Sequence, residues 1–190
     1  MLSLQGGYAI EPTPKMLEAE RQDHEEVMRL LESAIKASSY FRIEAIPDLL
    51  SKLRREWEPF ARVKTNIAFE GSEFLSVQEK RALGLNTRTK YSKPFISYFD
   101  PKCLKTIEPK SVLENMHLSA FHRVARKRDL AEFRSLGVKR VRIIPAGDAR
   151  DCATIKSFKK LHDIGRVPDL PVPGCTAPYC RCMYEPIIPK

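Results

Sequence analysis

The sequence predicts a mainly helical α+β protein with N-terminal helices, a small mixed sheet and a proline-rich C-terminal segment that resembles a metal knot. Stretches with apolar residues at three- and four-residue spacing predict the helices, and two alternating stretches predict strands. Prolines and cysteines gather near the C-terminus. We therefore expect an acidic helical region over residues 1–45, a basic α+β body over 46–145 and a cysteine-bearing segment over 146–190.

The first two helices are expected near the N-terminus. Over residues 14–38, apolar side chains fall on one stripe and glutamates on the other faces. A second helix is expected over residues 47–58, because proline suits a first helical position and Leu50, Leu53 and Trp57 share a stripe.

A basic strand and a short helix are expected next. Residues 61–69 (ARVKTNIAF) alternate between apolar and polar side chains, which predicts a half-buried strand with Arg62 and Lys64 on its outer face. Ser76 and Glu79 predict a capping box at the start of a short helix that ends near Gly84.

The rest of the body is expected to hold a helix that breaks and a second strand. Ser111 and Glu114 predict a capping box for the helix. Its apolar register breaks at the charged run 126–129 (RKRD), where Asp129 is expected to begin another short helix. Residues 138–144 (VKRVRII) alternate and predict a strand.

The charge of the chain is uneven. The net charge is +9, but residues 1–50 carry −4 and residues 51–190 carry +13. This favours a polyanion or an acidic protein surface as the partner of the body, although a basic surface also serves solubility alone. No apolar run approaches the roughly 20 residues of a membrane-spanning helix, and the start lacks signal-peptide features. We expect a soluble, cytoplasmic or virion-associated protein with no membrane partner.

The stretch 173–182 (PGCTAPYCRC) holds three of the five cysteines. Four thiolates suit a structural zinc ion, which would give shape to a proline-rich segment with little core of its own. The expected zinc ligands are Cys152, Cys175, Cys180 and Cys182. A straight helix over 152–162 would separate Cys152 from His162 by about 15 Å, so Cys152 is preferred and His162 is the substitute ligand if the helix breaks or Cys152 points away. Unligated reduced thiols, a disulfide and a reactive thiol stay open, and a disulfide is disfavoured in a reducing compartment.

The string GDARDC that ends at Cys152 has two physical interpretations: Asp148 and Arg150 form a bidentate pair at the entry to the metal site, or the string is a solvated turn. Together with PGCTAPYCRC it resembles the C-terminal signature of Mu-F-like minor head (head morphogenesis) proteins of tailed phages. The matching residues are Asp148, Arg150, Cys152, Cys175, Cys180, Arg181 and Cys182. The resemblance covers residues 146–190 and implies a phage context with a virion or DNA-handling role; Ile155 stands where the family often has another cysteine.

Three basic groups are candidates for nucleic-acid contact. Lysine and arginine mixed with hydroxyl and amide donors bind phosphates, and an aromatic ring stacks on an unpaired base. The expected nucleic-acid-binding residues are Arg62, Lys64, Arg88, Lys90, Tyr91, Lys93, Arg123, Arg126, Lys127, Arg140 and Arg142. The alternative is that these are solvated faces and that Tyr91 belongs partly to the core. Because no base-reading motif is present, we expect contacts to phosphate of DNA or RNA.

Enzyme motifs are absent from the sequence: it has no phosphate-binding loop, no dinucleotide-binding glycine pattern and no nucleophile elbow. We assign no catalytic residue and favour a non-enzymatic, zinc-stabilised, nucleic-acid-binding accessory protein of bacterial or phage origin. One alternative is a phage virion structural or head-assembly protein, and another is a small metal-dependent nuclease that uses His122. His117 is expected in the core.

Overall fold

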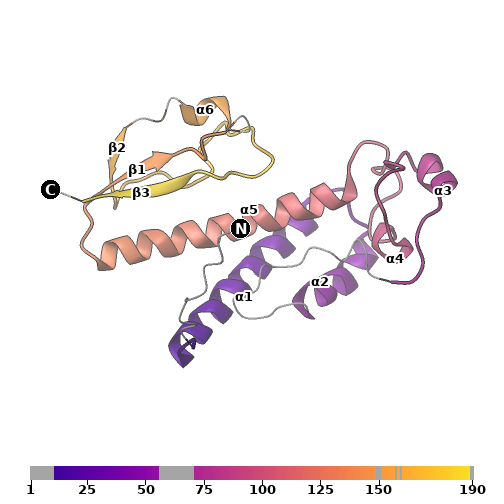
Figure 1. Ribbon diagram of the computed structural model, residues 1–190, viewed down its shortest axis with the longest axis horizontal. Helices are drawn as coiled ribbons and strands as arrows, with labels where there is room; N and C mark the ends of the chain where they lie inside the picture. Colours follow the sequence, from indigo (N-terminus) through magenta and orange to yellow (C-terminus); the bar gives the residue numbers. More distant parts are fainter. Residues whose placement is uncertain (1–10, 56–70, 149–150, 157, 159, 189–190) are drawn as a thin grey trace, which may run out of the picture.

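A computed structural model of the protein describes residues 11–55, 71–148, 151–156, 158 and 160–188. Its elements are α1 (Pro14–Ala37), η1 (Ile43–Ala45), α2 (Ile46–Arg55), α3 (Val77–Ala82), α4 (Lys93–Ile96), α5 (Pro109–Ser135), β1 (Arg140–Ile144), α6 (Ala153–Lys156), β2 (Leu161–Asp163) and β3 (Met183–Ile187). The predicted mainly helical α+β class is confirmed (Figure 1). The strand expected over 61–69 lies outside the described residues, as does the end of the second helix. In the described part of the chain, no helix has the length and hydropathy to cross a bilayer.

The expected first helix is confirmed as α1. The Thr13 hydroxyl accepts a hydrogen bond from the Met16 backbone N–H at 3.2 Å, and Pro14 occupies the first turn, where its missing N–H costs nothing. The buried stripe of α1 is Val27, Met28, Leu31 and Ile35. The glutamates of the other faces mostly pair with arginine or lysine one turn away, which stabilises the helix weakly.

The capping box of α3 is confirmed as well. The Glu79 N–H donates to the Ser76 hydroxyl at 3.2 Å, and the Ser76 N–H donates to the Glu79 carboxylate at 2.7 Å. Gly84, with a φ of +74°, ends the helix as expected.

The long helix α5 differs from the prediction. Glu108, not Ser111, caps it: the Glu108 carboxylate accepts from the Ser111 N–H at 2.5 Å. The expected capping box of Ser111 with Glu114 is therefore wrong. The break at 126–129 is also wrong, because α5 runs on to Ser135. The buried face of α5 continues through the charged run because Arg126 points inward and is 4% exposed.

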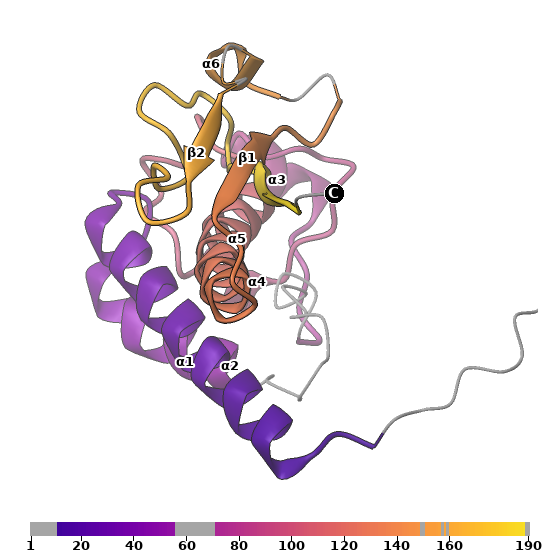
Figure 2. The same cartoon turned by 90° about the vertical axis from the view of Figure 1, so that its left-hand side faces the viewer.

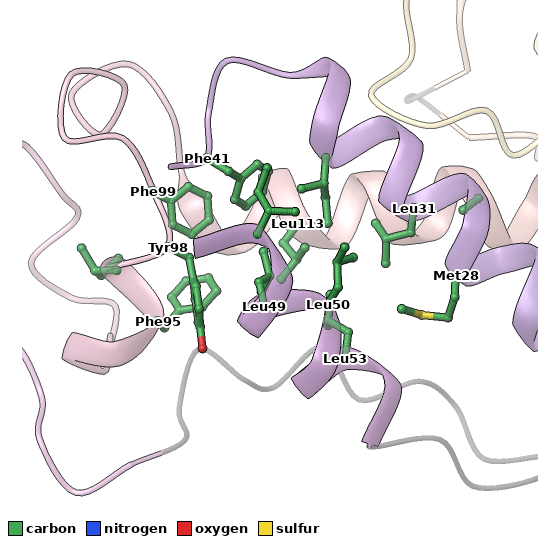
Figure 3. Packing of buried hydrophobic residues seen from close by; sticks show 14 of the residues in the cluster. Met28, Leu31, Phe41, Leu49, Leu50, Leu53, Phe95, Tyr98, Phe99 and Leu113 are labelled. Atoms are coloured by element: carbon green, nitrogen blue, oxygen red, sulfur yellow. The ribbon is translucent and has the colours of Figure 1, made fainter. Parts of the chain in front are cut away.

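A first hydrophobic cluster, which we name the helical core, joins α1, α2, α4 and the N-terminal half of α5. Figure 3 shows side chains from these helices and from the neighbouring turns pointing toward one another. Its aromatic part packs closely, with ring centroids of Phe41 and Phe99 4.7 Å apart and those of Phe95 and Phe99 5.2 Å apart. Burial of this apolar surface is the main force that holds α1 on α5.

A second cluster, the C-terminal core, lies beneath a three-stranded sheet of order β2-β1-β3. Both pairings are antiparallel, so the described sheet is antiparallel and not mixed as expected. Val141 and Ile143 of β1 are buried, as the alternation predicts. From α5, the buried Leu130 and the partly buried Phe133 contribute to this core. The sheet lies on one side of α5, whereas α1 and α2 lie on another, so α5 is the element shared by both cores (Figures 1 and 2).

Candidate metal centre and basic groove

The cysteines predicted as metal ligands come together in the C-terminal core, and we name them the cysteine cluster. They are Cys152, Cys175, Cys180 and Cys182. Three of the four are buried, and Cys175 is partly buried. Cys103 lies apart from them, with its thiol donating to the Ser39 carbonyl at 3.3 Å.

The sulfurs of the cysteine cluster influence one another in two close pairs, Cys152 with Cys175 and Cys180 with Cys182. Burial raises the pKa of Cys182 to about 12, helped by the neighbouring Cys180. Burial also raises the pKa of Cys175.

The surroundings of the Cys152 sulfur lower its pKa. Burial acts to raise its pKa, but the backbone N–H groups of Ile155, Thr176 and Thr154, together with the Cys175 thiol, outweigh burial and lower it. Backbone N–H groups aimed at a sulfur stabilise a thiolate. The segments that carry Cys152 and Cys175 are also joined directly, since the Thr154 hydroxyl donates to the Gly174 carbonyl at 2.9 Å.

The arrangement of possible ligands differs in part from what the sequence suggests. Within the described ranges, no three His, Cys, Asp or Glu side chains are placed as ligands of one ion. The helix assumed over 152–162 is wrong, because α6 ends at Lys156 and His162 lies in β2 opposite Val141. The donor chemistry of the cysteine cluster nevertheless fits zinc: four sulfurs share one buried region, and backbone N–H groups support Cys152.

An ion pair links the two segments that carry the cysteine cluster. Asp148 pairs with Arg181, with N···O distances of 2.7 and 2.5 Å, whereas Arg150 of the expected pair lies outside the described residues. The Asp151 carboxylate accepts from the N–H groups of Ala146, Gly147 and Asp148 at 3.2, 2.7 and 3.1 Å. The two acidic side chains of the string GDARDC, Asp148 and Asp151, therefore both have specific partners.

Arg126 holds the C-terminal segment onto α5. Its guanidinium donates to the carbonyls of Cys180 at 2.9 Å, Cys182 at 3.3 Å and Leu170 at 3.1 Å. The prediction that Arg126 binds phosphate is therefore wrong for this side chain, because burial and three carbonyl acceptors occupy it.

The basic group around Tyr91 is largely committed to internal contacts. Tyr91 is fully buried and its hydroxyl donates to Glu108, so the prediction that it stacks on a base is wrong. Lys93 lies 3.4 Å from Glu79, and Lys90 lies 4.0 Å from the centroid of the Phe74 ring. Arg88 is exposed.

The basic residues expected on strands have different positions. On β1, Arg140 is exposed and Arg142 lies 3.3 Å from Glu185. Arg62 and Lys64 lie outside the described residues.

A hollow of about 380 Å³ lies between α1, α5 and the C-terminal segment, and we name it the basic groove. Its lining residues are Glu26, Arg29, Leu30, Arg123, Val124, Arg126, Lys127, Leu130, Arg134, Asp169, Leu170 and Tyr184. The sequence indicated Arg123 and Lys127 but not Arg29 or Arg134. Arg134 follows Lys127 by seven residues, and this spacing, which keeps both on one helix face, could have identified it. Arg29 lies in a helix rich in acidic residues, so its charge does not stand out in the sequence.

The two histidines of α5 have different surroundings. His117 is 5% exposed, as expected for a core residue, and burial, followed by the neighbouring charge of His24, lowers its pKa to about 4. The ring of His122 stacks on Tyr179 with centroids 5.8 Å apart. Burial and then the charges of Arg126 and Arg181 lower the pKa of His122.

The fold and the site define a mainly helical α+β protein with a buried cysteine cluster and a basic groove. No protein-family model matches the chain, and searches of curated proteins and of solved structures find no match either. The function is therefore argued from the site.

Proposed function

We propose that this protein is a non-enzymatic, zinc-stabilised, nucleic-acid-binding accessory protein of bacterial or phage origin. The observation that carries the proposal is the convergence of Cys152 with three cysteines more than twenty residues further along the chain. Cys152, Cys175, Cys180 and Cys182 would hold the zinc ion. When bound, zinc would supply bonds that replace the larger hydrophobic core this proline-rich segment lacks.

The charge of the body supports nucleic acid as the partner. Residues 51–190 carry +13, and Arg123, Lys127, Arg140 and Arg88 are exposed. Such side chains bind phosphates without reading bases, and the counterions that they displace from the nucleic acid favour binding.

A second candidate, a phage virion or head-assembly protein, is favoured by the ion pair of Asp148 with Arg181. The two residues belong to the two separate strings of the phage-like signature, and their contact supports the two strings as one structural unit. This candidate predicts a defined oligomer, or association with partner subunits, that is indifferent to added DNA.

The zinc proposal is tested by metal analysis of the purified protein together with titration of its thiols. We expect near-stoichiometric zinc and reaction of Cys103 alone. Cys103→Ser is the matched control and should keep the metal, whereas Cys152→Ser and Cys180→Ser should lose it. Five reactive thiols without metal would overturn the zinc proposal.

The nucleic-acid proposal is tested by fluorescence anisotropy with labelled single-stranded DNA, duplex DNA and RNA. We expect affinity that falls steeply with salt, by a slope of about −0.7 to −0.9 on a log–log plot for each phosphate contacted. Absence of binding to all three probes at low salt would reject it. Cleavage of a probe with added divalent metal, lost in His122→Ala, would instead establish the nuclease alternative.

A further inference from the structure

One face of α5 carries a stripe of basic side chains. Arg123, Lys127 and Arg134 are four and seven residues apart, which keeps them on one side of a helix with 3.6 residues per turn. At 1.5 Å per residue the stripe is about 16 Å long, and its first two members are about 6 Å apart along the axis. All three side chains are exposed. This spacing suits an anion that repeats along a chain.

The stripe forms one side of the basic groove, whose walls come from two different parts of the fold. Glu26, Arg29 and Leu30 of α1 form one wall, and residues 169–170 with Tyr184 form the other. α1 and the C-terminal segment lie on different sides of α5 (Figures 1 and 2), and residues of all three line the groove.

The stripe carries more positive charge than the carboxylates beside it offset. The hydrogen bond with Arg29 lowers the pKa of Glu26, and Lys127 and Arg123 lie close enough for their charges to lower it further. Arg134 donates to the neutral carbonyl of Ile164 at 3.1 Å. Of the two acidic residues in the lining, Glu26 is engaged by Arg29, with an N···O distance of 2.7 Å. The groove therefore keeps an excess of positive charge, with Asp169 as the opposing carboxylate.

The other basic groups offer less free charge. Lys93 and Arg142 are paired with carboxylates, and Lys90 lies over the Phe74 ring. Lys139 and Arg140 border a hollow that is otherwise mainly apolar. Arginine and lysine without internal partners are those that gain most from a phosphate, because no existing ion pair must be broken.

We infer that the basic groove is the site where this protein binds the phosphate backbone of a nucleic acid, through Arg123, Lys127 and Arg134. The inference rests on the proposed function and deepens it, since it names the binding surface. Arg29, released from Glu26, lies on the opposite wall and can contact the same strand. Contacts of this kind position a strand without selecting its sequence.

The test compares two charge-matched double variants with labelled single-stranded DNA as the probe. Arg123→Gln/Lys127→Gln removes two charges from the groove, and Lys102→Gln/Lys105→Gln removes two exposed lysines from the turn after Asp100. We expect the groove variant to lose about tenfold or more in affinity and to lower the salt slope by about 1.5. The control should keep the salt slope and lose far less affinity. Unchanged circular dichroism shows that both variants fold.

Each result has a distinct meaning. Equal losses in the two variants would overturn the groove and leave the proposed function standing, because overall charge would then drive binding. Failure of the unaltered protein to bind any nucleic-acid probe would overturn both. Binding of polyglutamate in preference to DNA would assign the groove to an acidic protein and overturn the inference.

Discussion

Asp148 and Arg181 form a bidentate ion pair that connects positions 33 residues apart, with N···O distances of 2.7 and 2.5 Å. Arg181 stands between Cys180 and Cys182, and Asp148 lies four residues before Cys152. The pair therefore fastens together the two segments that supply the cysteine cluster. A planar guanidinium matches the two carboxylate oxygens in a way that a lysine ammonium does not.

We predict that Arg181→Lys loosens the cysteine cluster while keeping its charge. If zinc is bound there, its affinity should fall about tenfold, as is common when an outer contact of a metal site is altered. The measurement is a competition with a chromophoric chelator. Arg166→Lys, an exposed arginine of the same segment, is the control and should leave the affinity unchanged. Equal affinities for all three proteins would contradict the prediction.

Elements whose ends and faces depend on near neighbours are predictable from this sequence. The capping box of Ser76 and Glu79 and the buried face of β1 are examples, because each rests on residues two or three positions apart. Helix α5 marks the limit of such reasoning. On local criteria the run 126–129 indicates a break, since nothing nearby reveals that Arg126 finds carbonyl acceptors 44 to 56 residues away.

The candidate site also has features that nearby residues predict and features that depend on distant contacts. The sequence indicated that the four cysteines lie near one another, and they do share the C-terminal core, but no three of the described His, Cys, Asp or Glu side chains are placed as ligands of one ion. The burial of Tyr91 depends on Glu108, and the basic groove depends on how α1 and the C-terminal segment sit on α5. These are long-range contacts, and local residue patterns do not encode them.

We predict that Arg126→Met destabilises the C-terminal core far more than its size suggests. The variant would leave three buried carbonyls without their donor, and an unsatisfied buried polar group costs about 1–3 kcal/mol. Urea unfolding should therefore show a loss of at least about 2 kcal/mol, together with faster modification of the cluster thiols. Arg123→Met, on the exposed face of the same helix, is the control and should change stability by less than about 0.5 kcal/mol. Equal effects would mean that the carbonyl contacts contribute little.

Glu108 is expected to be the anchor for the start of α5. Its carboxylate accepts from the Ser111 N–H and from the Tyr91 hydroxyl, so Glu108→Ala removes a helix cap and leaves a buried phenol without a partner. We expect a loss of about 2–4 kcal/mol in the free energy of unfolding. Tyr91→Phe removes the phenol contact and keeps the cap, and should cost less. Thermal unfolding of the three proteins checks this order, and a larger loss for Tyr91→Phe would contradict it.

His117 should make stability depend on pH in the mildly acidic range. Burial, and then the charge of His24, lower the pKa of His117 from 6.5 to about 4. Between these values the unfolded chain takes up a proton that the folded protein does not, so stability falls as pH is lowered from 6.5 toward 4. The loss from this group is at most about 3.5 kcal/mol. Urea unfolding of the protein and of His117→Gln across this range checks it, since the difference between the two should shrink at low pH. A constant difference would show that His117 does not titrate differently on folding.

Glu26, which lines the basic groove, and Asp23, three residues before it on α1, should weaken nucleic-acid binding at the groove. Glu26 neutralises Arg29, and Asp23 lies 2.8 Å from Arg128. Deletion of α1 would not test this, because Val27, Met28, Leu31 and Ile35 belong to the helical core. We therefore predict that Glu26→Gln/Asp23→Asn raises the affinity for single-stranded DNA about three- to tenfold at low salt, and by less at high salt, where exposed charges are screened. Glu18→Gln/Glu25→Gln is the matched control: both residues pair with Arg21 on the same helix and neither lines the groove. An equal gain in the control would mean that the overall charge of α1, and not its place beside the groove, sets the affinity.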